Sequence, residues 1–210
     1  MIPLILLIFS HLASSPSATH ETVEEVVAVV DRTPILTSDI ELAAVLGLSG
    51  HPVDTVDPVD RSRLLDARIQ LEVQFRDLES SGVLYRLDLR VTEVRRELVA
   101  GAGGEEAVQA KLTAAGLADT DIDELALRIS AANAYAEQRL RPRVNASMKE
   151  IESAYRDLAV ELESRGEVAP PLTAIHDQLH RLITERKLND EIEQWTARAA
   201  AGREITRFIE

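Results

Sequence analysis

Two histidines four residues apart, His176 and His180, form the pattern in this sequence that comes closest to a metal site. On a helix they would lie on one face, which is the spacing of the zinc ligands in many metalloproteases. Asp177 stands where such a site carries its glutamate base, and no third ligand is evident at a distance along the chain. We therefore interpret the pair as part of a solvent-facing helix and predict no metal site.

A group of aspartates imitates the start of a calcium-binding loop. Asp119, Asp121 and Asp123 have the required spacing, but Glu124 replaces the glycine and Ser130 replaces the bidentate glutamate. Carboxylates at the beginning of a helix are favourable without any ligand, because they complement the helix dipole. We interpret this group as the acidic N-terminus of a helix.

No nucleophile in the sequence has the surroundings that catalysis needs. The chain contains no cysteine, which excludes a thiol nucleophile, a lipid-modified cysteine and a disulfide framework. There is no Gly-x-Ser-x-Gly elbow. Asp54, Asp57 and Asp60 fit a loop that leads into a helix better than a pair of catalytic carboxylates. We predict no catalytic residue, no cofactor and no enzymatic activity.

Composition indicates a mainly helical protein with one core. The 210 residues are 45% hydrophobic but only 3% aromatic, and Ala, Leu, Glu and Arg dominate. The net charge of −13 argues against nucleic acid as a partner, because no basic stripe is present to displace counterions from phosphates.

The first 18 residues have the pattern of a signal peptide. Residues 2–9 form an apolar block, and residues 13–18 are small, as in a cleavage region. A membrane anchor is the alternative, but the apolar run is shorter than the roughly 20 residues that a spanning helix needs. We expect an exported, periplasmic protein with no membrane span after the signal is removed.

Residues 19–210 are predicted to form a single helical domain. A valine-rich hairpin is expected over residues 26–36, a helical body over 38–166, a long helix over 171–201 and a strand over 204–209. The last strand needs a partner, and the N-terminal hairpin is the other strongly β-like segment. The two ends of the chain are therefore expected to meet in a small sheet.

The long terminal helix carries two apolar stripes on opposite faces. The second stripe, in its C-terminal half, is expected to close the core, which leaves the first as an exposed binding patch. The first stripe consists of Leu172, Ile175, Leu179 and Leu182. Three tyrosines could line an apolar groove beside it, where the rings supply area and the hydroxyls bond a client backbone, although ordinary packing is the alternative; they are Tyr85, Tyr135 and Tyr155.

The order of these elements resembles SurA-type periplasmic chaperones. Residues 27–40 are similar to the opening hairpin and first helix of that family, and residues 64–71 are similar to its second helix. Residues 140–144 look like the beginning of the helix before its isomerase insert. Residues 185–189, followed by Trp195, resemble its closing helix.

The resemblance implies an ATP-independent chaperone, or holdase, whose clients are unfolded exported or outer-membrane polypeptides. The sequence departs from the family in one large respect, because residues 166–171 leave no room for the parvulin prolyl isomerase domain that usually lies there. Thr33 also replaces a glycine that is common in the hairpin turn. Two alternatives remain: a protein related to prolyl isomerases, and an assembly factor or homodimer that uses the same apolar faces for one fixed partner.

Overall fold

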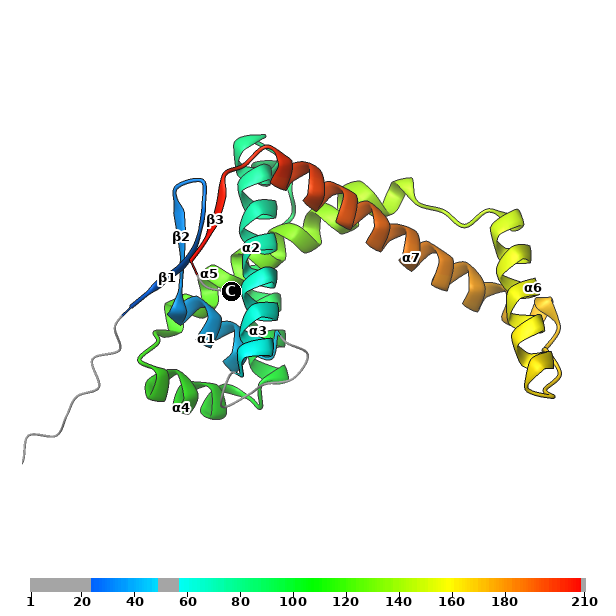
Figure 1. Cartoon of the computed structure of the whole chain (residues 1–210), viewed down its shortest axis with the longest axis horizontal. Coiled ribbons are helices and arrows are strands. Elements are labelled where there is room, and N and C mark those ends of the chain that lie inside the picture. The colour runs from blue at the N-terminus through cyan, green and yellow to red at the C-terminus, as the bar shows by residue number, and fades with distance from the viewer. Residues whose placement is uncertain (1–23, 49–56, 209–210) are drawn as a thin grey trace, which may run out of the picture.

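The computed structural model describes residues 24–48 and 57–208, and Figure 1 shows their arrangement. The described residues are 73% helical, with a small antiparallel sheet built from strands near both ends of the chain, which confirms the predicted fold class. The predicted signal peptide over residues 1–18 lies outside the described residues. Asp54 and the last residue of the predicted terminal strand, residue 209, also lie outside them.

The sheet joins the two ends of the chain. Strands β1 (Val26–Val30) and β2 (Thr33–Leu36) form the predicted hairpin, and β3 (Ile205–Arg207) pairs with the other edge of β1. Both pairings are antiparallel, with Val29 opposite Pro34 on one side and opposite Thr206 on the other. Pro34 has no N–H to donate, and it lies in an edge strand, where that loss costs least.

A polar contact at the hairpin turn fixes the end of the chain. Asp31 adopts a left-handed φ of 56° at the turn, a conformation that aspartate tolerates better than most residues. Its carboxylate lies 2.7 Å from Arg203 and accepts a hydrogen bond from the Glu204 N–H. The hydrogen bond from Arg203, followed by the one from Glu204, lowers the pKa of Asp31. The turn thereby positions β3 beside β1.

Five helices lie to one side of the sheet and, together with it, form what we call the body (Figure 1). Asp57 begins the second of them by accepting a hydrogen bond from the Asp60 N–H at 2.8 Å, with Pro58 in the first turn. Gly116 ends the fourth in a left-handed conformation. The helices are α1 (Thr37–Val45), α2 (Pro58–Ser80), α3 (Val91–Gly101), α4 (Glu105–Ala115) and α5 (Asp119–Tyr135), with a 3-10 turn at Leu84–Arg86.

Three apolar clusters hold the body together. The first packs the sheet against α1 and α2 around Leu64, and the second packs α1, α3, α4 and α5 around Leu112 and Ile122. The third packs α2 and α5 against the C-terminal half of the last helix, where the Trp195 ring lies 4.4 Å from that of Tyr135. These clusters exclude water from the faces that the helical periodicity marks as apolar.

The remaining helices extend away from the body. After α5 the chain passes through a π-helical segment (Ala136–Leu140) and a 3-10 turn (Arg141–Arg143) into α6 (Met148–Ser164). Helix α7 (Leu172–Ala201) then runs from α6 back to the sheet, so that α6 lies at the far end of the molecule (Figure 1). We call residues 146–187, which include α6 and the first part of α7, the arm.

Candidate binding surfaces on the arm and the body

The structure corrects the expectation that the first stripe of the terminal helix is exposed. Leu179 is only 6% exposed, and Leu172 and Ile175 are half-buried in the same cluster. Helix α6 covers them, because its own apolar face, including Ile151, packs against α7. The sequence prediction missed this pairing because it assigned α6 to the helical body.

Leu182 is the one member of the predicted stripe that stays open. It is 54% exposed, whereas the next residue, Ile183, is 8% exposed and belongs to the cluster with α6. One residue rotates a helical position by about 100°, so these neighbours cannot both face α6. Leu182 therefore points away from the cluster and remains available to another molecule.

The three predicted tyrosines do not share a groove. Tyr85 is 80% exposed in the 3-10 turn after α2. Tyr135 packs on Trp195 in the body. Tyr155 lies in the arm cluster, and its hydroxyl donates a hydrogen bond to the Pro170 carbonyl at 3.0 Å, which holds the connection between α6 and α7 against α6. Only Tyr85 has the exposure that the prediction requires.

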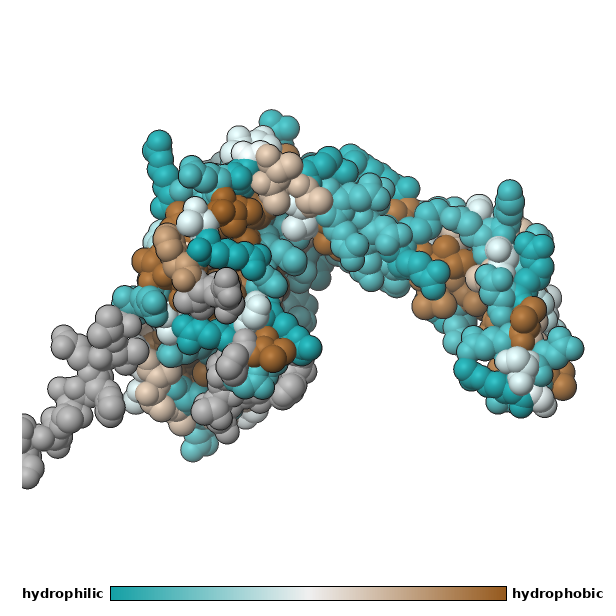
Figure 2. Space-filling view, in the orientation of Figure 1, coloured by the Kyte–Doolittle hydropathy of each residue, from teal (hydrophilic) through white to brown (hydrophobic). Residues whose placement is uncertain are grey.

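Exposed apolar side chains are concentrated on the arm. Eight large hydrophobic residues are exposed among those that the structure describes, and four of them belong to the arm: Met148, Val160, Val168 and Leu182. Val168 is 93% exposed and Val160 is 68% exposed. In Figure 2, hydrophobic patches interrupt the hydrophilic surface where α6 meets α7. The sequence did not single out Val160 or Val168, because each is an isolated apolar residue outside the apolar stripes of the helices.

The arm is fixed to itself by ion pairs at its base. The Lys187 ammonium lies 3.0 Å from the Glu150 carboxylate, which also accepts hydrogen bonds from the Ser147 hydroxyl and N–H. The bonds from Ser147 and then from Lys187 lower the pKa of Glu150 to about 2. Closer to the body, Arg141 lies 2.7 Å from Glu185 and lowers the pKa of that carboxyl.

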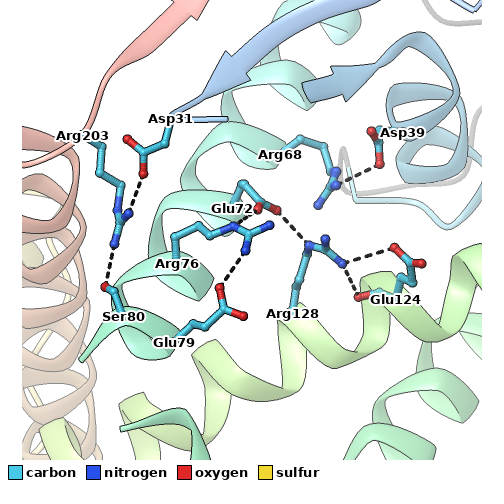
Figure 3. A network of polar contacts seen from close by, with 10 residues as sticks. All are labelled: Asp31, Asp39, Arg68, Glu72, Arg76, Glu79, Ser80, Glu124, Arg128 and Arg203. Atoms are coloured by element: carbon cyan, nitrogen blue, oxygen red, sulfur yellow. Dashed lines mark hydrogen bonds and ion pairs between the residues drawn. The ribbon is translucent and has the colours of Figure 1, made fainter. Parts of the chain in front are cut away.

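The body contains a buried network of charged side chains, shown in Figure 3. Glu72 is 1% exposed and accepts hydrogen bonds at 2.8 Å from both Arg76 and Arg128. Burial by itself would raise the pKa of Glu72, but the hydrogen bonds and charges of the two arginines outweigh burial and hold that pKa below its ordinary value. The network joins α2 to α5.

A pocket of about 340 Å³ adjoins this network between β2, α1, α2 and the start of α5. Its polar side holds Arg68 and Arg128, and its apolar side includes Leu36, Leu42 and Leu125. Arg68 is 5% exposed and donates through Nη2 to Asp39 at 2.9 Å. Its Nε and Nη1 atoms have no hydrogen-bond partner. A buried guanidinium with two unused donors is energetically costly, which distinguishes this pocket from the other surface hollows.

The histidine pair has separate partners. The His176 ring lies 3.0 Å from Asp177, and the His180 ring lies 3.1 Å from the side-chain oxygen of Asn145. Within the described residues, no group of three or more His, Cys, Asp or Glu side chains has the geometry to hold a metal ion. The described part of the chain also contains no helix both long and apolar enough to cross a membrane.

No protein-family model matches this sequence, and no curated protein matches it either.

Proposed function

We propose that this protein is a periplasmic, ATP-independent chaperone that holds unfolded exported polypeptides. Support comes from the resemblance of its elements to SurA-type chaperones and from the shape of the molecule, in which a packed body carries a projecting arm (Figure 1). The proposed localisation rests on the signal-like residues 1–18.

The observation that carries the proposal is the exposed apolar surface of the arm. Exposed apolar patches on a protein surface often mark binding sites, and Figure 2 shows hydrophobic patches where α6 meets α7. Val160, Val168, Met148 and Leu182 supply aliphatic area without deep pockets. Such a surface binds many apolar segments weakly, because each buried side chain contributes only about 1.5–3 kcal/mol before ordering costs are subtracted. Weak binding suits a chaperone that releases its clients without nucleotide hydrolysis.

The test is suppression of aggregation of an unfolded β-barrel client, followed by light scattering. We expect suppression at stoichiometric ratios of chaperone to client. The double variant V160Q/V168Q removes exposed apolar area from the arm and should lose most of the suppression. Val59, 60% exposed on the body, provides the matched control, and V59Q should behave like the wild type. Absence of suppression by the wild type at several-fold excess would refute the proposal.

We further propose that the chain acts without prolyl isomerase activity. Residues 165–171 alone connect α6 to α7, which leaves no space for the enzyme domain of the related family. Isomerisation of a proline-containing peptide should therefore proceed at the uncatalysed rate when the protein is added. A rate clearly above that background would favour the isomerase alternative.

The alternative of a fixed partner or a homodimer uses the same arm surface. Copies of this chain repel one another through a net charge of −13, which disfavours self-association. Sedimentation should show a monomer at micromolar concentration. A tight dimer that dissociates in the V160Q/V168Q variant would replace the chaperone proposal with the structural one.

A further inference from the structure

The pocket beside β2 presents unused hydrogen-bond donors next to an apolar wall. Arg68 has one ionic partner, Asp39, and its Nε and Nη1 atoms make no hydrogen bond. Figure 3 shows the Arg68 guanidinium near that of Arg128, with Arg68 joined to Asp39 and Arg128 joined to Glu72. Arg128 is already satisfied by Glu72 and by the Glu124 carbonyl. Arg68 is therefore the side chain that gains most from an additional acceptor.

The charge of the pocket identifies the kind of acceptor. Its lining contains two arginines, Arg68 and Arg128, against four carboxylates, and this excess of negative charge opposes a bound anion. A neutral hydrogen-bond acceptor is not repelled by these carboxylates. The carboxylates of Asp39 and Glu72 already accept hydrogen bonds from protein groups, so they do not need a cationic ligand. A peptide carbonyl has the required charge and chemistry.

The β2 edge of the sheet lacks backbone N–H donors that an added strand would need. Pro34 has no N–H, and the Leu36 N–H donates to Asp39 at 2.9 Å. Two of the four residues of β2 thus have no free donor, which weakens ordinary strand addition at this edge. A chain lying beside β2 would find its donor in Arg68 instead, and Leu36, Leu42 and Leu125 would face its side chain.

We propose that this pocket binds one residue of an extended polypeptide, whose backbone carbonyl accepts a hydrogen bond from Arg68 and whose apolar side chain contacts the leucines. The identity of the ligand rests on the proposed chaperone function. Arg68 already lines the pocket, and its Nε and Nη1 atoms have no partner. A carbonyl bound there accepts from one of these nitrogens while Nη2 keeps its bond to Asp39. The site recognises main chain, which every client has, and selects for a nearby apolar residue.

The direct test is a titration of the ¹⁵N-labelled full-length protein, observed at the arginine Nε–H resonances. The probe is the capped, uncharged peptide N-acetyl-Ala-Leu-Ala-amide, and R68M assigns the Arg68 signal. We expect the peptide to shift the Arg68 signal in a saturable way and sodium acetate at equal concentration to leave it unchanged. A shift by acetate but not by the peptide would overturn the proposal in favour of an anion site. No shift by either would overturn it in favour of a pocket that holds water only.

Affinity measurements on variants provide a second test. R68M should weaken binding of the fluorescently labelled peptide by about tenfold, the effect of one lost hydrogen bond at the upper end of its usual range. R63M is the matched control on the same helix, since the Arg63 side chain is 72% exposed. Equal affinity of R68M and R63M would count against the proposal. Should R68M fail to fold, R68K keeps a positive charge beside Asp39 but has no arginine Nε–H, so it assigns the Arg68 signal and the wild-type titration decides the question.

The two proposals fail in distinguishable ways. If the wild type suppresses aggregation but the Arg68 signal does not respond to the peptide, the pocket proposal is wrong and the chaperone proposal stands. If the Arg68 signal responds but aggregation proceeds unchanged, the pocket binds peptide in a protein with another role.

Discussion

The body and the arm are both built mainly from helices but differ in how many apolar residues they bury. The cluster beneath the sheet contains twelve buried apolar residues, whereas the arm cluster contains four. Local opening costs less free energy where fewer apolar contacts are lost. We infer that the body is a stable scaffold and that the arm, which carries four of the eight exposed large hydrophobic residues among those described, opens more easily.

The charged side chains compared below are likewise more buried in the body than in the arm. In the body, Glu72 is buried and satisfied by two arginines. In the arm, the Glu150 and Lys187 pair is partly exposed, with side-chain exposures of 42% and 37%. A buried pair is costly to break, while an exposed pair is screened by water and salt. The comparison predicts a ranked series of effects.

The largest effect is expected in the body core. Leu64 is 1% exposed, and L64A should lower the free energy of unfolding of the whole protein by about 4 kcal/mol, because it removes buried methylene groups and leaves a cavity. Urea denaturation followed by circular dichroism measures this. V59A, at an exposed position of α2, should stay within about 0.5 kcal/mol of the wild type. Equal losses in both variants would show that the body core is not packed as described.

The buried network should give the next largest effect. E72Q leaves Arg76 and Arg128 without their carboxylate and should cost about 3 kcal/mol at neutral pH. Because the folded-state pKa of Glu72 lies below its ordinary value, its stabilising contribution is complete above the unfolded-state pKa near 4.5 and declines as pH falls toward the folded-state value. The difference between wild type and E72Q should therefore shrink below about pH 4.5. A difference that stays constant down to pH 3 would contradict this account.

A deletion in the arm core should have a smaller and more local effect. Ile151 is 2% exposed, and I151A should reduce the protection of α6 amides by about 2 kcal/mol while protection in α2 stays unchanged. Hydrogen exchange resolved by residue measures both helices in one experiment. A parallel loss of protection in α2 would mean that arm and body unfold as one unit, which would remove the distinction between them.

The smallest effect is expected from E150Q at the base of the arm. The folded-state pKa of Glu150 is lowered to about 2 from an ordinary value of 4.5, so its contribution is present above about pH 4.5 and disappears as pH falls toward 2. E150Q should therefore speed exchange of α6 amides at pH 6 and have little effect at pH 2. K149Q, on the exposed face of α6, serves as the control. An effect of E150Q that is independent of pH would exclude this mechanism.

Features that depend on a few neighbouring residues were readable from the sequence. The valine-rich hairpin, the long terminal helix and the Ser147–Glu150 capping box are set by local periodicity, turn chemistry and caps, and the structure contains all three. The pairing of the terminal strand with the N-terminal hairpin was also predictable, because the hairpin was the one strongly β-like segment available as a partner.

The features that sequence reasoning missed depend on which surfaces meet. Helix α6 covers the stripe around Leu179, yet the apolar periodicity of α6 is equally compatible with packing on the body. The pocket combines Asp39, Arg68 and Arg128, which lie on three helices and are far apart in the chain. Spacing along one helix carries no information about such a site. Exposed valines such as Val160 become informative only when their neighbours are known to be buried.

Site-specific photo-cross-linking to an unfolded β-barrel client tests most directly whether the arm is the surface that binds clients. A photoreactive residue is placed at position 160 or 168 on the arm, and at position 109 on the exposed side of α4 as the body control. We predict strong client adducts at positions 160 and 168, lost when the client is folded, and few at position 109. Equal labelling at all three positions, or labelling mainly at position 109, would contradict the division into a supporting body and a binding arm.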